Sequence, residues 1–185
     1  MKAIVKGSLT DMQQQNGNKS LAETFLSAEL VVLVDTSASM GQHDAPGGIS
    51  RYEAACNQLK DIQGKNPGKV AVISFSSWPT FCPNGTPDNL NGSTDMVAAL
   101  QFVKPVDGTD TKIVLVSDGE PDQADETLKL AGTFQTSIDV IYIGKEGGYG
   151  YQFLQQLAKL TGGKSFKSEA PGLLGDGIET LLLIG

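Results

Sequence analysis

One uninterrupted apolar run constrains this chain more than any other feature. Residues 30–34 read Leu-Val-Val-Leu-Val, and the run ends at Asp35. No polar residue alternates with the apolar ones, which is typical of a central strand buried on both faces of a sheet. Strands of this kind occur in α/β proteins, where helices cover both faces of a parallel sheet. The run therefore predicts the central strand of such a sheet.

The rest of the chain alternates between short apolar runs and helical patterns. We expect further strands at residues 69–75, 112–116, 138–143 and 164–167. We expect helices from residue 50, from residue 94, and at 122–135, 150–161 and 172–183. Residues 76–93 are rich in proline and glycine and predict a short hairpin with an antiparallel edge strand. The alternation predicts βαβ units, and hence a doubly wound, mostly parallel α/β sheet of five or six strands with helices on both faces.

The length of 185 residues suits one domain with a substantial core. We assign residues 29–185 to that domain and residues 1–28 to an N-terminal extension that packs on it. Within the extension we expect a strand near residues 3–9. A short helix should follow, because Ser20 and Glu23 have the spacing of a capping box.

The charge balance excludes some classes of partner. Lys and Arg number 14 and Asp and Glu 21, so the formal net charge is −7. Nucleic acids and anionic membrane surfaces call for basic patches, so we expect neither as a partner. No apolar run approaches the roughly 18 residues of a membrane span, and the start lacks an apolar signal region. We therefore expect a cytoplasmic protein, although a fragment of a secreted parent would read the same way.

Oxygen-bearing side chains follow the predicted strands. Asp35, Ser37 and Ser39 come directly after the run at 30–34, and Asp118 follows the strand at 112–116. Thr94 stands where a loop enters a helix. Ligands of open parallel sheets bind outside the carboxyl ends of the strands. Carboxylate and hydroxyl oxygens suit a hard divalent cation, so these residues predict a metal site at that edge.

Together these segments resemble the von Willebrand factor A domain family, which includes the integrin I domains. The family's metal-ion-dependent adhesion site has its three parts in the order found here: Asp35-Thr-Ser37-Ala-Ser39, Gly92-Ser-Thr94 and Ser117-Asp118-Gly119. The resemblance covers about residues 29–184. Ala38 is a departure, because many members have glycine there; a methyl group should be tolerated unless the backbone needs a positive φ.

The resemblance implies a role for each site residue. Ser37 and Ser39 would bind the metal through their hydroxyls, and Thr94 would bind it directly or through water. Asp35 and Asp118 would act largely through water. The implied metal is Mg²⁺, with Mn²⁺ or Ca²⁺ as alternatives. An Asp or Glu carboxylate of a protein partner would complete the coordination, and members inside cells commonly serve as scaffolds in ATPase-containing or other assemblies.

Simpler interpretations stand beside this one. Thr94 could be only the N-cap of its helix, and Asp118 only part of a tight turn. The domain could be structural, with a vestigial metal site. It could also be a metal-dependent hydrolase or phosphatase with Asp35 as nucleophile, but Ser37 occupies the place where that class needs a second acid. We therefore expect a binding module and not an enzyme.

Three other sequence patterns are better explained by structural or surface roles than by a binding site. Residues 158–165 match a loose phosphate-loop pattern, but they follow a helix, so Gly162 should end that helix. His43 should be a surface loop residue. Trp78 and Phe81 should pack along the sheet edge, with an exposed binding patch as the alternative.

Overall fold

The computed structural model describes residues 3–16, 20–45, 47–89, 91–144 and 148–167. The strands are β1 (Leu30–Asp35), β2 (Val70–Phe75), β3 (Pro79–Phe81), β4 (Lys112–Ser117), β5 (Ile138–Tyr142) and β6 (Ser165–Lys167). The helices are α1 (Leu9–Asn16), α2 (Leu21–Leu26), α3 (Arg51–Lys65), α4 (Met96–Val103), α5 (Ala124–Ala131) and α6 (Tyr149–Thr161), with 3₁₀ turns at Ala38–Gly41 and Lys104–Val106. The helix expected at 172–183 lies outside the described residues.

The described strands form one sheet in the order β3-β2-β1-β4-β5-β6. β3 runs antiparallel to β2, and every other neighbouring pair is parallel. The predicted doubly wound sheet with a short antiparallel edge strand is therefore confirmed. Within the same residues, no helix is both long enough and apolar enough to cross a membrane.

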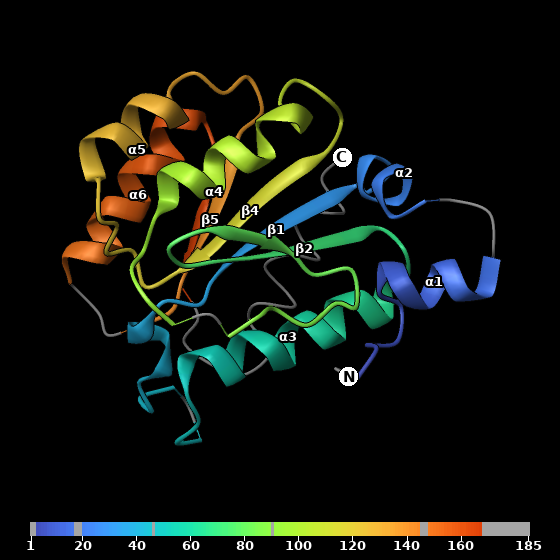
Figure 1. Cartoon of the computed structure of the whole chain (residues 1–185). Helices are drawn as coiled ribbons and strands as arrows, with labels where there is room; N and C mark the ends of the chain where they lie inside the picture. Colours follow the sequence, from blue (N-terminus) through green and yellow to red (C-terminus); the bar gives the residue numbers. More distant parts are fainter. Residues whose placement is uncertain (1–2, 17–19, 46, 90, 145–147, 168–185) are drawn as a thin grey trace.

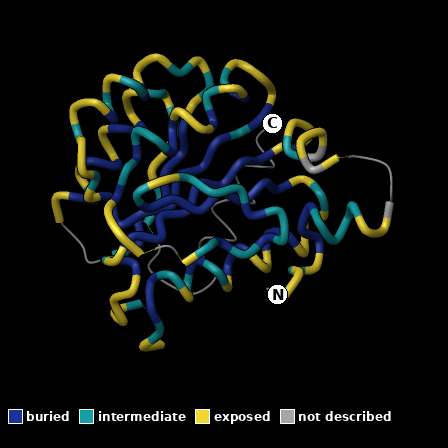
Figure 2. Tube along the Cα trace, viewed as in Figure 1, coloured by how far each residue is buried: buried dark blue, intermediate teal, exposed yellow. Residues whose placement is uncertain are grey.

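The two faces of the sheet are covered by different helices (Figure 1). Val31 and Leu33 belong to the core shared with α4, α5 and α6, whereas Val32 and Val34 belong to the core on the α3 side. β1, β2 and β5 are accordingly buried throughout, whereas the edge strands β3 and β6 are only partly buried. Exposed residues lie mainly on the outer surfaces of the helices and in the loops (Figure 2). Because both faces are covered, β1 needs apolar side chains at every position, which explains the uninterrupted run.

The strand predicted near residues 3–9 is wrong. Residues 6–8 form a turn instead, and α1 begins at Leu9. Gly7 has a φ of +80°, and its N–H donates to the Asp11 carboxylate, which closes a local turn that a strand does not allow. The capping box predicted for the following helix is confirmed, because the Ser20 and Glu23 side chains each bond the other's backbone N–H.

Two helices are shorter than their apolar patterns suggest. α4 starts at Met96, two residues after Thr94, because Asp95 serves as its N-cap. α5 covers 124–131 instead of 122–135. The Asp122 backbone N–H donates to the Thr94 carbonyl oxygen. Asp122 therefore belongs to the loop before α5 and not to the helix. Both differences arise where the chain passes the carboxyl edge of the sheet.

Candidate metal centre

The strand order places β1 and β4 side by side at the centre of the sheet. From β1 the chain goes to β2 and β3 on one side, and it then returns to β4 on the other side. Such a reversal leaves a crevice at the carboxyl ends of the two central strands, where α/β proteins bind ligands. Asp35 ends β1 and Asp118 directly follows β4, so both acids lie at this point.

Asp35 is fully buried, and both of its carboxylate oxygens have protein donors. The Ser37 backbone N–H donates to Oδ1 at 2.8 Å, and the Ser117 hydroxyl donates to Oδ2 at 2.6 Å. The pKa of Asp35 is raised to about 6, chiefly by burial; the Ser117 and Ser37 hydrogen bonds lower it in part, and the charge of Asp118 also raises it. With both oxygens engaged, Asp35 positions the Ser37 backbone and the end of β4.

The two motif serines lie in contact. The Ser37 and Ser39 hydroxyl oxygens are 3.1 Å apart, and Ser39 lies in the 3₁₀ turn that follows β1. Asn91 is the only non-glycine residue with a positive φ among the described residues, so Ala38 fits without backbone strain. The Ala38 N–H also donates to the Gly92 carbonyl oxygen at 3.2 Å, which joins this turn to the segment that carries Thr94.

Thr94 is buried and is held by backbone contacts on both sides. Its N–H donates to Asp122 Oδ1 at 3.2 Å, and its carbonyl oxygen accepts from the Asp122 N–H at 3.1 Å. The N-cap of α4 is Asp95, whose carboxylate accepts from the Ala98 N–H at 2.9 Å. The N-cap interpretation of Thr94 is therefore wrong. Among the described residues, the Thr94 hydroxyl makes no hydrogen bond to the other four candidates.

Asp118 pairs with an arginine from α3. Arg51 Nη1 donates to Asp118 Oδ2 at 2.8 Å, and the side chains are only 9% and 4% exposed. The other oxygen, Oδ1, is buried and has no hydrogen-bond partner in the described structure. A buried carboxylate oxygen without a donor is costly, so this atom marks the place where a ligand would be stabilised.

A small pocket opens beside Asp118. It has a volume of about 210 Å³ and is lined by Ser39, Gln42, Arg51, Asp118, Glu120, Tyr142 and Gly148. Gly150 packs directly against the Asp118 backbone, since a side chain at Gly150 would collide with the Asp118 carbonyl oxygen. The pocket therefore contains one predicted hydroxyl ligand, one predicted carboxylate and a buried guanidinium.

The donor set fits a hard cation. Ser37, Ser39 and Thr94 offer hydroxyls, and Asp118 offers an unpaired carboxylate oxygen. Mg²⁺ takes few protein ligands, all of them oxygens, and keeps several waters. The described residues contain no cluster of three or more His, Cys, Asp or Glu side chains suited to a metal, so a cation here would depend on the hydroxyls.

Sequence reasoning missed several residues of this edge, above all Arg51, Ser117 and Asp44. Arg51 carried a usable signal: it is the first residue of α3, where the helix dipole disfavours a positive charge. A residue that breaks a local rule is a candidate for function. Ser117 entered only as the residue before Asp118 in the third part of the motif, and no local signal indicates that its hydroxyl bonds Asp35.

The structure also tests the sequence predictions for Gly162, His43 and the two aromatic residues near β3. Gly162 ends α6 with a φ of +76°, which confirms its role as a terminating glycine. His43 is exposed, and its Nδ1 lies 3.3 Å from the Gly48 carbonyl oxygen, in the loop beside the site. Phe81 packs edge-to-face on Phe25 as predicted, with ring centroids 5.2 Å apart. Trp78 is 62% exposed, so edge packing does not describe it.

No protein-family profile matches the chain, and no curated protein matches it. Solved structures do match over most of its length. The conserved hypothetical protein BatB from Bacteroides thetaiotaomicron has a TM-score of 0.64 at 17% identity, covering 84% of this chain and 97% of that one. An aerotolerance-related membrane protein from Bacteroides fragilis has a TM-score of 0.58 at 18% identity, with 83% and 97% covered.

A third match names the fold. A von Willebrand factor type A structure from Catenulispora acidiphila has a TM-score of 0.60 at 14% identity, covering 84% of this chain and 42% of that one. Identities this low establish the architecture alone. The strand order, the covering helices and these neighbours agree, and the chain has the fold of a von Willebrand factor A domain.

Proposed function

We propose that this chain is a metal-dependent protein-interaction module that captures an acidic side chain of its partner. The observation that carries the proposal is the unpaired, buried Oδ1 of Asp118 at the switch point of the sheet. Asp118 lines one pocket with Ser39, whose hydroxyl contacts that of Ser37. Ser37, Ser39 and Thr94 would hold Mg²⁺, or Mn²⁺ in its place, while Asp35 and Asp118 support them. Bound there, the cation would supply an open position for a carboxylate.

The ligand chemistry favours capture of an anion. Three of the five proposed residues contribute neutral hydroxyls, which leave the charge of a cation largely uncompensated. The chain as a whole carries a net charge of −7, and Glu120 lines the pocket. An acidic partner would be repelled by this edge unless a cation were present. Partner capture should therefore depend on the metal, in an assembly that could include an ATPase, and no catalysis by the chain itself is proposed.

One observation favours a second candidate, a structural domain with a vestigial site. Arg51 already gives Asp118 a positive partner, so the acid can remain buried without a metal. The two functions differ in a simple respect. A vestigial site binds neither Mg²⁺ nor a partner carboxylate, whereas an interaction module needs both.

The test is capture of partners from native lysate by the immobilised chain in Mg²⁺, followed by elution with a chelator. A protein eluted from the wild-type chain should be absent when Ser37→Ala is immobilised. Replacing one acidic residue of that protein by its amide should then abolish binding. Capture that persists in chelator, or that survives every such replacement, contradicts carboxylate capture.

A further inference from the structure

Arg51 is the most heavily engaged side chain at this edge of the molecule. Its Nε and Nη2 donate to both oxygens of Asp44, at 2.8 and 2.7 Å, and Nη2 also donates to Gln42 Oε1 at 3.0 Å. Nη1 donates to Asp118 Oδ2. One guanidinium thus joins the loop after the serine motif, the first turn of α3 and the end of β4.

This network places a permanent positive charge inside the candidate metal site. The hydrogen bonding of Arg51 to the Asp44 carboxylate is the largest cause that raises the pKa of Arg51 above its ordinary value, so the guanidinium stays charged. Arg51 is buried and lines the same pocket as Asp118 and Ser39. Its charge is therefore poorly screened by solvent, and a divalent cation bound in the pocket would be repelled by it.

We propose that Arg51 is the resident counter-cation of the site, and that its pairing with Asp118 limits how tightly a divalent cation binds. The inference rests on the proposed function, because it assumes that a divalent cation binds at the same candidate site. Without Arg51, Asp118 is a buried carboxylate with no positive partner, and a divalent cation becomes its best available counter-charge. Arg51 thus stabilises the metal-free site at the expense of metal affinity.

Asp44 has the opposite effect on cation affinity, because its negative charge offsets part of the Arg51 charge. It holds Arg51 by a bidentate pair, and its own side chain is 20% exposed in the loop before α3. Without the Asp44 carboxylate, the positive charge of Arg51 is less compensated, so it repels a cation in the pocket more strongly. Loss of Asp44 should therefore weaken divalent binding, whereas loss of the Arg51 charge should strengthen it. A purely architectural role of the network predicts weaker binding in both cases.

The experiment is a Mn²⁺ titration of the full chain, followed by the electron paramagnetic resonance signal of free Mn²⁺. Arg51→Gln should bind Mn²⁺ about tenfold more tightly than wild type, and Asp44→Asn several-fold more weakly. Arg51→Lys keeps the charge and should stay near wild type. Lys69→Gln is the charge-matched control, because Lys69 forms an exposed pair with Glu29 at the opposite end of β1 and should change nothing.

Each outcome has a definite meaning. Unchanged or weaker binding by a folded Arg51→Gln overturns the inference even if wild type binds Mn²⁺ as proposed. Binding by Arg51→Gln alone supports the inference and refutes the proposed function of the wild-type chain. Binding by neither refutes both. If circular dichroism shows that Arg51→Gln is unfolded, Arg51→Lys and Asp44→Asn decide together. Wild-type affinity in Arg51→Lys with weaker binding by Asp44→Asn supports the inference. Weaker binding by both variants, or unchanged binding by Asp44→Asn, overturns it.

Discussion

Arg51 and Asp118, which are 67 positions apart in the sequence, form a buried ion pair of 2.8 Å between the first turn of α3 and the carboxyl end of β4. The pair joins the helix on one face of the sheet to the strand at its centre. Both side chains line the same pocket as Ser39, whose hydroxyl contacts that of Ser37. The stability of the metal-free domain and the chemistry of its candidate site therefore depend on the same two side chains.

Removing one member of this pair should destabilise the fold. Asp118→Ala leaves Arg51 buried with one fewer acceptor, and breaking buried pairs costs about 3 kcal/mol or more of unfolding free energy. Because Asp44 still binds Arg51, we expect about 2 kcal/mol in urea denaturation without metal. The exposed pair of Glu29 and Lys69 is the matched control, and Glu29→Ala should cost under about 1 kcal/mol. Equal losses for the two variants would contradict the buried role of Asp118.

Asp35 should make the metal-free protein less stable as the pH rises. Its pKa is raised from 3.8 to about 6 in the folded chain, so between these values the folded state binds more protons than the unfolded state. The free energy of unfolding therefore falls across this window, by at most about 3 kcal/mol. Asp35→Asn should remove this component of the pH dependence, as measured by urea denaturation from pH 4 to pH 7. Parallel profiles for the two proteins would show that the charge of Asp35 is not destabilising.

Thr94 and Asp95 are neighbours with separable roles. Asp95 caps α4, so Asp95→Ala should cost about 1 kcal/mol of stability with little effect on Mn²⁺ affinity. Thr94→Ala should weaken Mn²⁺ binding and leave the helix intact, because the Thr94 backbone contacts to Asp122 remain. Thermal denaturation and Mn²⁺ titration of both variants check this. A Thr94→Ala protein with unchanged affinity would remove Thr94 from the proposed ligands.

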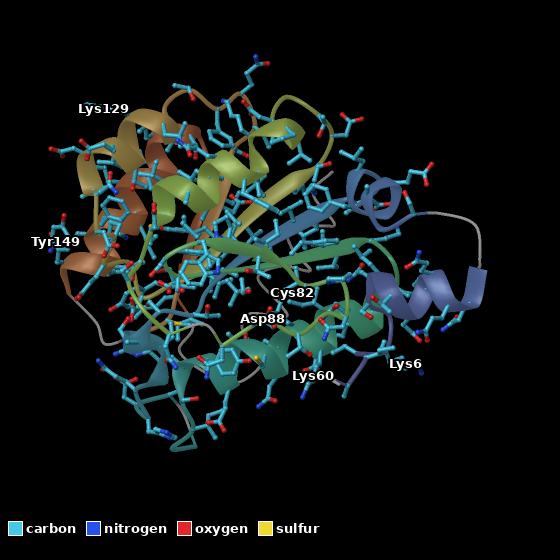
Figure 3. All side chains as sticks on the ribbon, in the orientation of Figure 1. Lys6, Lys60, Cys82, Asp88, Lys129 and Tyr149 are labelled. Carbon is cyan, nitrogen blue, oxygen red and sulfur yellow. The ribbon has the colours of Figure 1, made fainter. Side chains whose placement is uncertain are left out.

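Two exposed aromatic side chains should contribute to partner capture. Trp78 follows β2 and is 62% exposed; Tyr149 begins α6 at the outside of the molecule and is 61% exposed (Figure 3). Exposed Trp and Tyr residues commonly anchor protein interfaces. Trp78→Ala and Tyr149→Ala should reduce Mg²⁺-dependent capture without changing Mn²⁺ affinity. Leu160 is 50% exposed near the other end of α6, and Leu160→Ala should leave capture unchanged. Equal capture by all three variants would exclude the aromatic residues from the interface.

The fold could be predicted from the sequence because its signals are local and agree with one another. The apolar run of β1 predicts burial on both faces, and the capping pair of Ser20 and Glu23 predicts where α2 begins. The strand predicted near residues 3–9 is wrong, because Gly7 and Asp11 form a local turn that competes with extended structure. Likewise, α5 begins later than its apolar pattern predicts, because Asp122 contacts Thr94 instead of joining the helix.

The candidate site could be predicted only in part. Asp35, Ser37 and Ser39 are close in sequence, and the sheet topology brings Asp118 to the same edge. The pairing of Arg51 with Asp118 could not be predicted, because it depends on how α3 lies against the sheet across 67 positions. The bond from Ser117 to Asp35 spans 82 positions and depends on the register of β1 and β4. Such contacts follow from packing and not from local pattern.

Mn²⁺ binding to the wild-type chain and to Ser37→Ala tests the central claim most directly. Ser37 Oγ contacts Ser39 Oγ, while the Ser37 backbone N–H that bonds Asp35 is kept in the variant, so the fold should survive the substitution. Electron paramagnetic resonance should show one Mn²⁺ ion per wild-type chain, displaced by Mg²⁺, and no specific binding by Ser37→Ala. Equal binding by the two folded proteins, or none by wild type, would contradict the account.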